Sequence, residues 1–242
     1  MKPKMQQNKV VVFSGAGLSA ESGLPTYRDG DGLWNTHSWL ELASPRGWKC
    51  QPEAVLAFYN ERRRMAWEAL PNAAHLAIAA LEAVYEVVVI TQNVDALHER
   101  AGSTHVIHLH GELAWARGTS AEPKRYHFGG APILPGQLCE DGTQLRPDVV
   151  WFGEETRNME VARQHLRSAG KVLVVGTSLG VQPAASLLKA THYMAEKVLI
   201  AQERPEAMPQ RFRFACGNAA TLVPRLVERW VDNAGSLSPR AP

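Results

Sequence analysis

The sequence predicts an α/β protein in which a doubly wound parallel sheet carries a smaller inserted domain. Apolar, β-branched runs recur along the 242 residues, and helical patterns alternate with them. The runs are VVVFSG, VVVITQN, VIHLHG, VLVVGTS and VLIAQ, which begin at Val10, Val87, Val106, Val172 and Val198. Near-continuous apolar runs are typical of strands that are covered on both faces, as in a parallel sheet.

Helical patterns occupy the intervals between these strands. Residues 72–85 precede the second strand, 161–170 precede the fourth, 184–196 precede the fifth, and 222–231 follow the last. Strands that alternate with helices in this way predict crossover units, and crossover units build a parallel sheet with helices on both faces.

Two segments interrupt the alternation and predict the inserted domain. Residues 29–75 hold helical patterns where a strand is expected, and 113–148 are rich in glycine, proline and charge without clear periodicity. We therefore expect these two segments to form a small domain, and 1–28, 76–112 and 149–232 to form the main domain. Residues 233–242 are expected to be a disordered tail. A ligand cleft is expected where the two domains meet.

Composition and charge exclude several classes of function. Lys plus Arg number 26 against 24 Asp plus Glu, and a net charge of +2 gives no strongly basic surface, so no nucleic acid and no membrane is expected as a partner. Cys50, Cys139 and Cys216 lie far apart, which argues against a disulfide framework and an intact four-cysteine metal site. The apolar run behind the basic N-terminus is too short for a signal or membrane segment, so a cytoplasmic protein is expected. The sequence predicts no particular oligomeric state.

A glycine loop follows the first strand. GAGLSA satisfies the G-x-G-x-x-G/A pattern of a Rossmann-like fold, in which Gly15 makes the turn, Gly17 lets the backbone approach a pyrophosphate and Ala20 permits close packing. A glycine turn in an unrelated α/β protein explains this motif equally well. A dehydrogenase would continue into a long helix and a second strand with an acidic end, but Gly23 and Pro25 interrupt the helix and no such strand follows.

The longer run GAGLSAESGLPTYR resembles the first motif of the sirtuin family. The matching residues are Gly15, Ala16, Gly17, Ser19, Ser22, Gly23, Pro25, Tyr27 and Arg28. In that family a short helix and the mobile loop after it close over NAD and hold its nicotinamide ribose. The resemblance implies that the main domain is a Rossmann-like NAD-binding domain with NAD as co-substrate. The contacts it assigns here are Gly15, Ala16, Gly17, Tyr27 and Arg28.

Polar residues follow the second strand, at the edge where a parallel sheet binds ligands. Gln92, Asn93 and Asp95 belong to the run TQNVDALHERAG, and capping of the next helix by Asn93 or Asp95 is an open alternative. The run resembles the sirtuin motif T-Q-N-(I/V)-D-x-L-H, whose polar side chains line the pocket where nicotinamide leaves and the ribose is held. The resemblance implies that all three residues bind NAD and that Asn93 and Asp95 also take part in catalysis.

Two histidines alternate in THVIHLHGEL, so that His108 and His110 are expected to share one face of a strand. Such a pair can ligate a metal, but no nearby carboxylate or cysteine completes a set, and a structural core histidine is the commoner case. His110 directly precedes Gly111 and matches the HG motif of the sirtuin family, whose histidine is the general base for a ribose hydroxyl. A pKa near neutrality suits that task.

A third segment, GTSLGVQPAAS, places Gly176, Thr177 and Ser178 at another strand end. The resemblance implies that these three residues bind NAD and that the backbone of Val181 pairs with an extended substrate peptide. Ala201 departs from the family, because many sirtuins have an asparagine there that contacts the adenosine ribose.

One arginine lies on the apolar stripe of the helix PEAVLAFYNERRRMAWEAL. At about 100° per residue, Arg62 falls on that stripe, whereas Arg63 and Arg64 point away and are expected to be solvated. A buried guanidinium requires an anionic partner, which is either an Asp or Glu of this chain or the carboxylate of a substrate. Tyr59 can offer its hydroxyl to the same anion. The pair matches the Tyr-x-x-Arg of class III sirtuins, which binds the acid end of succinyl-lysine; the class often removes acetyl groups too.

Most sirtuins also carry two cysteine pairs after the HG motif, but only Cys139 stands at a matching position here. Gly118, Ala121 or a neighbour, and Gly136 occupy the other positions. One thiolate cannot hold a tetrahedral zinc ion, so we expect no zinc and a small domain that folds without metal.

Together the motifs resemble those of an NAD-dependent protein-lysine deacylase. The resemblance implies that the acyl oxygen of a modified lysine attacks C1′ of the ribose as nicotinamide leaves, and that His110 then activates the ribose hydroxyl. The products are O-acyl-ADP-ribose and free lysine. Phe152, beside Trp151, is expected to line the lysine tunnel, although two core aromatics fit the pattern equally well. The alternatives are an NAD or ADP-ribose sensor with little turnover and an ADP-ribosyl transferase or NAD hydrolase.

Overall fold

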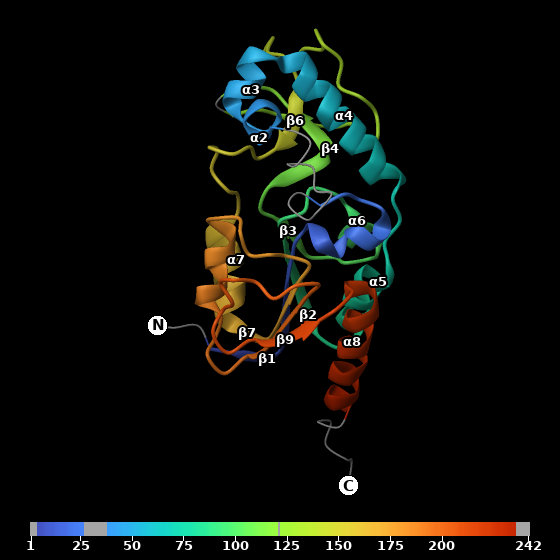
Figure 1. Cartoon of the computed structure of the whole chain (residues 1–242), viewed down its shortest axis with the longest axis vertical. Helices are drawn as coiled ribbons and strands as arrows, with labels where there is room; N and C mark the ends of the chain where they lie inside the picture. The colour runs from blue at the N-terminus through green and yellow to red at the C-terminus, as the bar shows by residue number, and fades with distance from the viewer. Residues whose placement is uncertain (1–3, 27–37, 121, 236–242) are drawn as a thin grey trace.

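The computed structural model describes residues 4–26, 38–120 and 122–235, which form a larger and a smaller lobe (Figure 1). The larger lobe holds a six-stranded sheet in the order β3-β2-β1-β7-β8-β9, with every neighbouring pair parallel. Its strands are β1 (Gln6–Ser14), β2 (Glu86–Thr91), β3 (Val106–His108), β7 (Ala169–Val175), β8 (Glu196–Ala201) and β9 (Arg213–Cys216). The order reverses between β1 and β7, and such a switch point is where open α/β sheets bind ligands.

Helices cover both faces of this sheet, which confirms the predicted doubly wound arrangement. Val10 and Val12 of β1 belong to a core with α5 (Ala73–Ala80), the 3-10 helix η3 (Leu81–Ala83) and α8 (Ala219–Gly235). Val11 and Phe13 belong to a second core with α7 (Met159–Ser168) and the 3-10 helix η4 (Ala184–Ala190). Figure 1 shows α7 on one side of the strands and α5 and α8 on the other. None of the helices described has the length and apolar character needed to cross a membrane.

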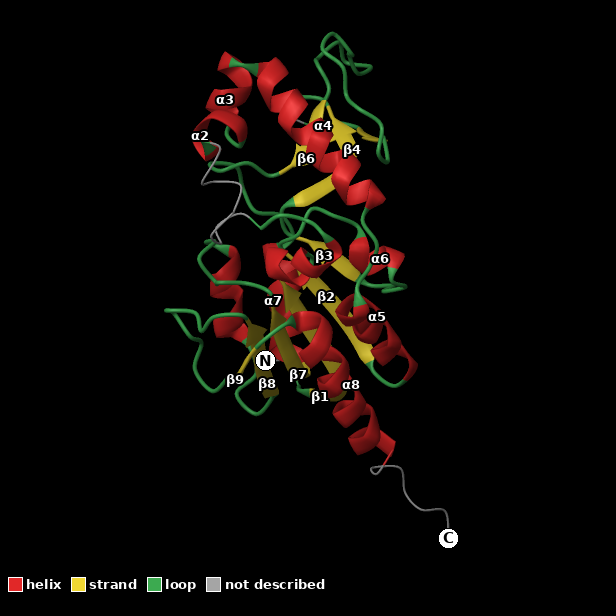
Figure 2. Cartoon of the chain, turned by 45° about the vertical axis from the view of Figure 1, so that its right-hand side comes forward, coloured by secondary structure: helices red, strands yellow, loops and turns green. Residues whose placement is uncertain are grey.

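The smaller lobe is built from the two segments that interrupt the strand–helix alternation (Figure 2). Its helices are α2 (Trp39–Leu42), α3 (Pro45–Cys50) and α4 (Pro52–Glu68), and its sheet has the antiparallel order β5-β4-β6, from β4 (Gly111–Arg117), β5 (Arg125–His127) and β6 (Arg146–Val149). Asn60 of α4 ties the helix to the second segment, since its amide donates to the Ile133 carbonyl and accepts the Ile133 N–H, both at 2.9 Å.

Several elements differ from the sequence-based expectation. Residues 184–196 are not one α-helix: only η4 forms, because Leu187 and Leu188 already reach the core within this short helix. The edge strand β9 was not expected, since two of its four residues are exposed, the other two are only partly buried, and the strand pairs with β8 alone in the described sheet. The three strands of the small sheet were also missed, because charged residues and an inward-facing proline hide their alternation.

The helix after the glycine loop is interrupted, as the sequence predicts, but it consists of two single 3-10 turns. These are η1 (Ala16–Leu18) and η2 (Ala20–Ser22). Gly23 ends the second turn with a φ of +85°, a left-handed conformation that glycine adopts without strain. Tyr27 and Arg28, the predicted NAD contacts that follow, lie outside the described residues.

Two buried histidines of the larger lobe predict a loss of stability in acid. The rings of His75 on α5 and His98 on α6 (Leu97–Arg100) lie 5.0 Å apart, and burial lowers the pKa of His75 from 6.5 to about 4. Burial also lowers the pKa of His98 well below its ordinary value. Because both rings bind protons near pH 6.5 once the chain unfolds, the free energy of unfolding decreases as the pH falls below about 6.5.

Urea unfolding at pH 7, 6 and 5 measures this loss. His75 accepts the Asn72 N–H in a reciprocal cap of α5, and glutamine at the same position can accept it too. His75→Gln therefore removes a titrating group, and should flatten the pH dependence by up to about 1.4 kcal/mol per pH unit. The exposed His105→Gln is the control. An unchanged pH dependence in His75→Gln contradicts the explanation.

Candidate active site

Glycines bring the ends of β1 and β7 into backbone contact at the switch point. The N–H of Gly17 donates to the Gly176 carbonyl at 2.8 Å. A Cβ on Gly176, whose φ is +64°, would lie 2.1 Å from the Leu18 nitrogen, and a Cβ on Gly15 would lie 2.7 Å from the Thr177 Cβ. Side chains are thus excluded at Gly15 and Gly176, and a loop backbone without side chains suits the phosphates of a dinucleotide.

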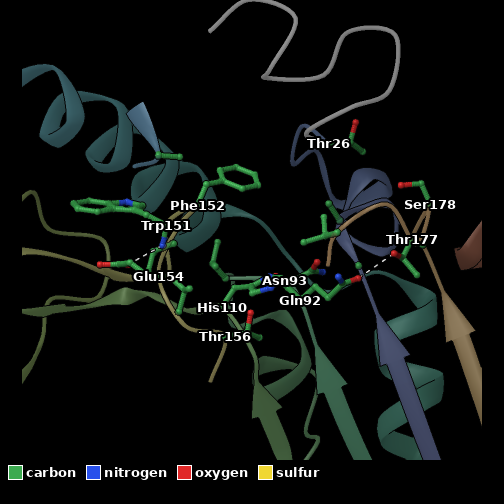
Figure 3. Close-up of a pocket in the computed structure, with 18 of the residues that line it drawn as sticks. Thr26, Gln92, Asn93, His110, Trp151, Phe152, Glu154, Thr156, Thr177 and Ser178 are labelled. Carbon is green, nitrogen blue, oxygen red and sulfur yellow. Dashed lines mark hydrogen bonds between the residues drawn. The ribbon is translucent and has the colours of Figure 1, made fainter. Parts of the chain in front are cut away.

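A cleft of about 190 Å³ opens beside these glycines. Strand ends of the larger lobe form one side, and residues 149–154 with α4 form the other (Figure 3). Most of the predicted site residues line it: Gly15, Ala16, Gly17, Tyr59, Gln92, Asn93, His110, Phe152, Gly176, Thr177, Ser178 and Val181. Three motifs far apart in the sequence therefore meet at one cavity.

Two predicted residues, Asp95 and Arg62, line a smaller cavity that adjoins the cleft. The two cavities share Ala16 and Asn93 on their walls. The predicted pair on α4 is therefore divided, with Tyr59 on the cleft and Arg62 on the smaller cavity.

The cleft also has lining residues that sequence reasoning missed. Among them are Thr26, which lies inside the first motif at a position that the resemblance does not assign, and Ala43 and Thr156, whose neighbours in the sequence carry no motif that singles them out. Folding alone brings Ala43 and Thr156 to the cavity, because the end of α2 and the loop before α7 lie beside the strand ends of the larger lobe.

Polar side chains at the strand ends hold one another in place. The Thr177 hydroxyl donates to Oε1 of Gln92 at 3.0 Å (Figure 3). Nδ2 of Asn93 donates to Oγ of Ser19 at 3.1 Å, and that hydroxyl donates to Oδ2 of Asp95 at 3.0 Å. The role of Ser19 as the bridge was also missed, although it belongs to the first motif.

Asp95 is buried, and its carboxylate accepts the first N–H of the helix that follows. Burial raises the pKa of Asp95, and its hydrogen bonds with the Leu97 N–H and the Ser19 hydroxyl oppose this rise. The Leu97 N–H, at the start of α6, donates to Oδ1 of Asp95 at 3.1 Å. The N-cap residue of α6 is Ala96, so Asp95 is not the N-cap that the alternative predicted; its carboxylate instead accepts the first N–H of the helix from the preceding turn and also lines the smaller cavity.

His110 presents a basic nitrogen in the cleft. It lies between β3 and β4, so the prediction that it shares a strand face with His108 is wrong. Nδ1 of His110 lies 3.1 Å from the Gln92 carbonyl oxygen, an acceptor only, so this nitrogen carries the hydrogen and Nε2 is the nitrogen with the free lone pair. Burial lowers the pKa of His110, which keeps the ring neutral at neutral pH.

The arginines of α4 do not divide as the helical pattern predicts. Arg62 is buried, at 9% exposure, as expected, but Arg63 is only 1% exposed. Arg63 donates from Nε to the Leu113 carbonyl and from Nη1 to Asn60, and burial lowers its pKa to about 10. The prediction that Arg63 is solvated is wrong, because α4 is packed on two sides. Arg64 is solvated as predicted, with ion pairs to Glu61 and Glu68.

A stacked cluster forms the wall of the cleft opposite the strand ends. The Arg146 guanidinium carbon lies 3.2 Å from the centre of the Trp151 ring, and Arg146 pairs with both carboxylate oxygens of Glu154 at 2.6 and 3.1 Å. The Trp151 N–H of the backbone donates to the same carboxylate. Both Trp151 and Phe152 line the cleft; the core interpretation holds for Trp151, which belongs to a core cluster, and not for Phe152, which is 37% exposed.

The residues around Cys139, where the family resemblance would place a zinc ion, do not fit the metal. The Cys139 thiol donates to Oδ1 of Asp141 at 2.7 Å, and the Thr143 hydroxyl donates to the same oxygen. A Cβ on Gly118 would lie 2.7 Å from Sγ of Cys139, so the glycine is near this turn but supplies no ligand. Over residues 4–26, 38–120 and 122–235, no three His, Cys, Asp or Glu side chains are grouped as metal ligands.

Comparison with known proteins gives consistent matches. Residues 15–183 match the family model described as Sir2 family. An NAD-dependent protein deacylase of Helicobacter pylori is 46% identical over 226 residues, covering 90% of this chain and 97% of that protein. A mutant Sir2 homologue solved with ADP-ribose has a TM-score of 0.87 and 40% identity, covering 95% of this chain and 94% of that one. A Sir2 structure with a deacetylated peptide and 3′-O-acetyl-ADP-ribose has a TM-score of 0.78 and 29% identity, covering 91% and 92%.

Proposed function

This chain belongs to the Sir2 family and is an NAD-dependent protein deacylase, and we propose that it removes succinyl and acetyl groups from lysine side chains of proteins. The proposed products are nicotinamide, O-acyl-ADP-ribose and free lysine. NAD is the co-substrate, and the bare glycine backbone at the switch point is the part of the cleft that suits its phosphates.

The position and state of His110 carry the proposal. A neutral imidazole whose Nδ1–H is held by the Gln92 carbonyl can accept a proton at Nε2. The ribose hydroxyl is the proposed donor of that proton. Gln92, Asn93 and Asp95 are proposed to bind the nicotinamide ribose, and the network through Ser19 fixes two of these three side chains before substrate arrives.

The acidic acyl preference is supported by a buried cation close to the cleft. Arg62 lines the cavity that shares Ala16 and Asn93 with the cleft, and Tyr59 lines the cleft itself, one helical turn earlier on α4. A guanidinium can bind a carboxylate through two hydrogen bonds, which a neutral acetyl group cannot offer. We place the carboxylate of succinyl-lysine between these two side chains, and Phe152 and Val181 beside the peptide.

Mass spectrometry of one lysine peptide tests the proposal. The peptide is prepared in succinylated and acetylated forms and incubated with the protein, with and without NAD. The expected result is NAD-dependent loss of both acyl groups, with the succinyl group removed at the higher kcat/KM. If neither peptide loses its acyl group in an NAD-dependent way, the proposed deacylase activity is contradicted.

We also propose that the smaller lobe needs no zinc. Apolar packing of Leu56, Ala116, Ile133 and Leu145, with the two hydrogen bonds between Asn60 and Ile133, supports a lobe that is stable by itself. Treatment with a strong chelator should therefore leave the melting temperature and the deacylation rate unchanged. A fall in melting temperature that zinc reverses would contradict this.

Finally, we propose a cytoplasmic location and the two-domain division given by the sequence, with two bounds corrected: 73–75 join the main domain as the start of α5, and 233–235 join it as the end of α8 rather than a disordered tail. The free state of Cys50, Cys139 and Cys216 supports a reducing compartment. One core cluster made only of main-domain residues and another made only of residues of the smaller lobe support the division, and a third cluster, around Tyr59 and Trp151, joins the two lobes.

A further inference from the structure

A buried histidine outside the cleft contacts two hydrogen-bond acceptors at once. His108 lies at the end of β3 and is 8% exposed. Its Nδ1 is 3.2 Å from the Asn93 carbonyl oxygen, and its Nε2 is 2.7 Å from Oε1 of Glu99. A carbonyl and an ionised carboxylate only accept, so both ring nitrogens must donate, and a ring with two N–H groups is an imidazolium.

The charges around His108 favour this cationic form. Burial by itself lowers the pKa of His108, but the hydrogen bond and charge of Glu99, the charge of Glu112 and the Asn93 carbonyl together raise it above its ordinary value. The Asp95 carboxyl also interacts with the charge of the His108 ring, and this charge lowers the pKa of that carboxyl. The His98 ring also interacts with His108, but the pKa of His98 is strongly lowered. His98 is therefore neutral and does not oppose the positive charge of His108.

The ring is connected to the site through two of its polar residues. It holds the backbone of Asn93, whose side chain donates to Ser19, and Ser19 donates to Asp95. Burial favours the neutral form of Asp95, and the imidazolium is a cation that counters this effect. Loss of the proton from His108 would remove one of its two hydrogen bonds and the positive charge together.

We propose that His108 is a positioning residue that acts as an imidazolium, fixing the Asn93 backbone and keeping Asp95 ionised, so that binding of NAD weakens when the ring loses its proton. The inference rests on the proposed roles of Asn93 and Asp95. His108 does not itself line the described cavities that hold the site.

The direction of the pH dependence follows from the two histidines. His108 must be protonated and its pKa is raised, so its contribution is present at low pH and is lost as the pH rises through that pKa. His110 must be neutral and its pKa is lowered, so its contribution is lost as the pH falls through that pKa. kcat/KM for NAD therefore has a bell-shaped profile whose alkaline limb belongs to His108.

The test measures ADP-ribose binding by calorimetry between pH 6 and 9, and the protonation of His108 by nitrogen NMR of the histidine rings. The full-length wild type is compared with His108→Gln, Glu99→Gln and the control His105→Gln. Glu99 is partly exposed, at 39% for its side chain, so its variant keeps the fold even if His108→Gln does not. Binding and NMR need no turnover, so they remain informative if deacylation itself fails.

The expected result is that wild-type His108 carries two ring protons at pH 7 and that ADP-ribose binding weakens as this signal titrates. His108→Gln should bind about tenfold more weakly at pH 7 and lose the alkaline dependence. Glu99→Gln should move the alkaline limb to lower pH, and His105→Gln should match the wild type. A neutral His108 at pH 7, or an alkaline limb that persists unchanged in both variants, overturns the proposal.

Discussion

Replacing His110 by asparagine is expected to lower kcat for deacylation by about 10²- to 10⁴-fold, the range that general bases contribute. The asparagine amide can still donate to the Gln92 carbonyl, as Nδ1 of His110 does, so the strand end should keep its geometry. The change removes Nε2, the nitrogen proposed to accept the ribose proton. Steady-state kinetics with a succinylated peptide measure the loss.

Binding of ADP-ribose separates this explanation from a structural one. His110→Asn should bind ADP-ribose with nearly the wild-type dissociation constant, because the glycine backbone and Gln92 are unchanged. If activity and binding fall together, His110 supports the shape of the cleft and its assignment as the base is wrong. The exposed His105→Asn serves as the matched control.

The second large effect is expected on acyl selectivity. Arg62→Met should lower kcat/KM for succinyl-lysine by about 10- to 100-fold, since a hydrogen bond to a charged group contributes about 1.5–3 kcal/mol. The kcat/KM for acetyl-lysine should change by less than about threefold, because an acetyl group has no carboxylate for Arg62 to bind. Competition between the two peptides in one reaction measures the ratio directly.

Neighbouring arginines on α4 provide the controls for this experiment. Arg64→Met removes a solvated arginine, with its side chain 52% exposed, and should leave the selectivity unchanged. Arg62→Lys keeps the charge but not the planar fork, and should recover only part of the preference. Equal losses on both peptides in Arg62→Met would identify Arg62 as a structural ion-pair residue of this chain.

The parallel sheet and the motifs at its edge could be predicted because they are local signals. The apolar runs from Val10, Val87, Val172 and Val198 all became strands of one sheet. Parallel strands place their carboxyl ends together, so GAG, TQN and GTS meet at one cavity. The small sheet could not be predicted in the same way, because its short strands mix charged and apolar residues and depend on packing against α4.

The misassignment of Arg63 has a physical cause that a helical wheel cannot show. One side of α4, with Val55, Tyr59 and Ala66, packs in the cluster that contains Trp151. Another side, with Leu56, packs against the core of the small sheet. A single stripe predicts one buried face, whereas the tertiary structure buries two, and Arg63 lies on the second. Thr156 and Ala43 reach the cleft for the same kind of reason, through contacts distant in the sequence.

Product stoichiometry tests the central claim most directly. A succinylated lysine peptide and NAD are incubated with the protein, and the products are quantified by liquid chromatography and mass spectrometry. We expect equal amounts of deacylated peptide, nicotinamide and O-succinyl-ADP-ribose. Free succinate formed without nicotinamide, or nicotinamide released at the same rate without the peptide, would contradict the assignment.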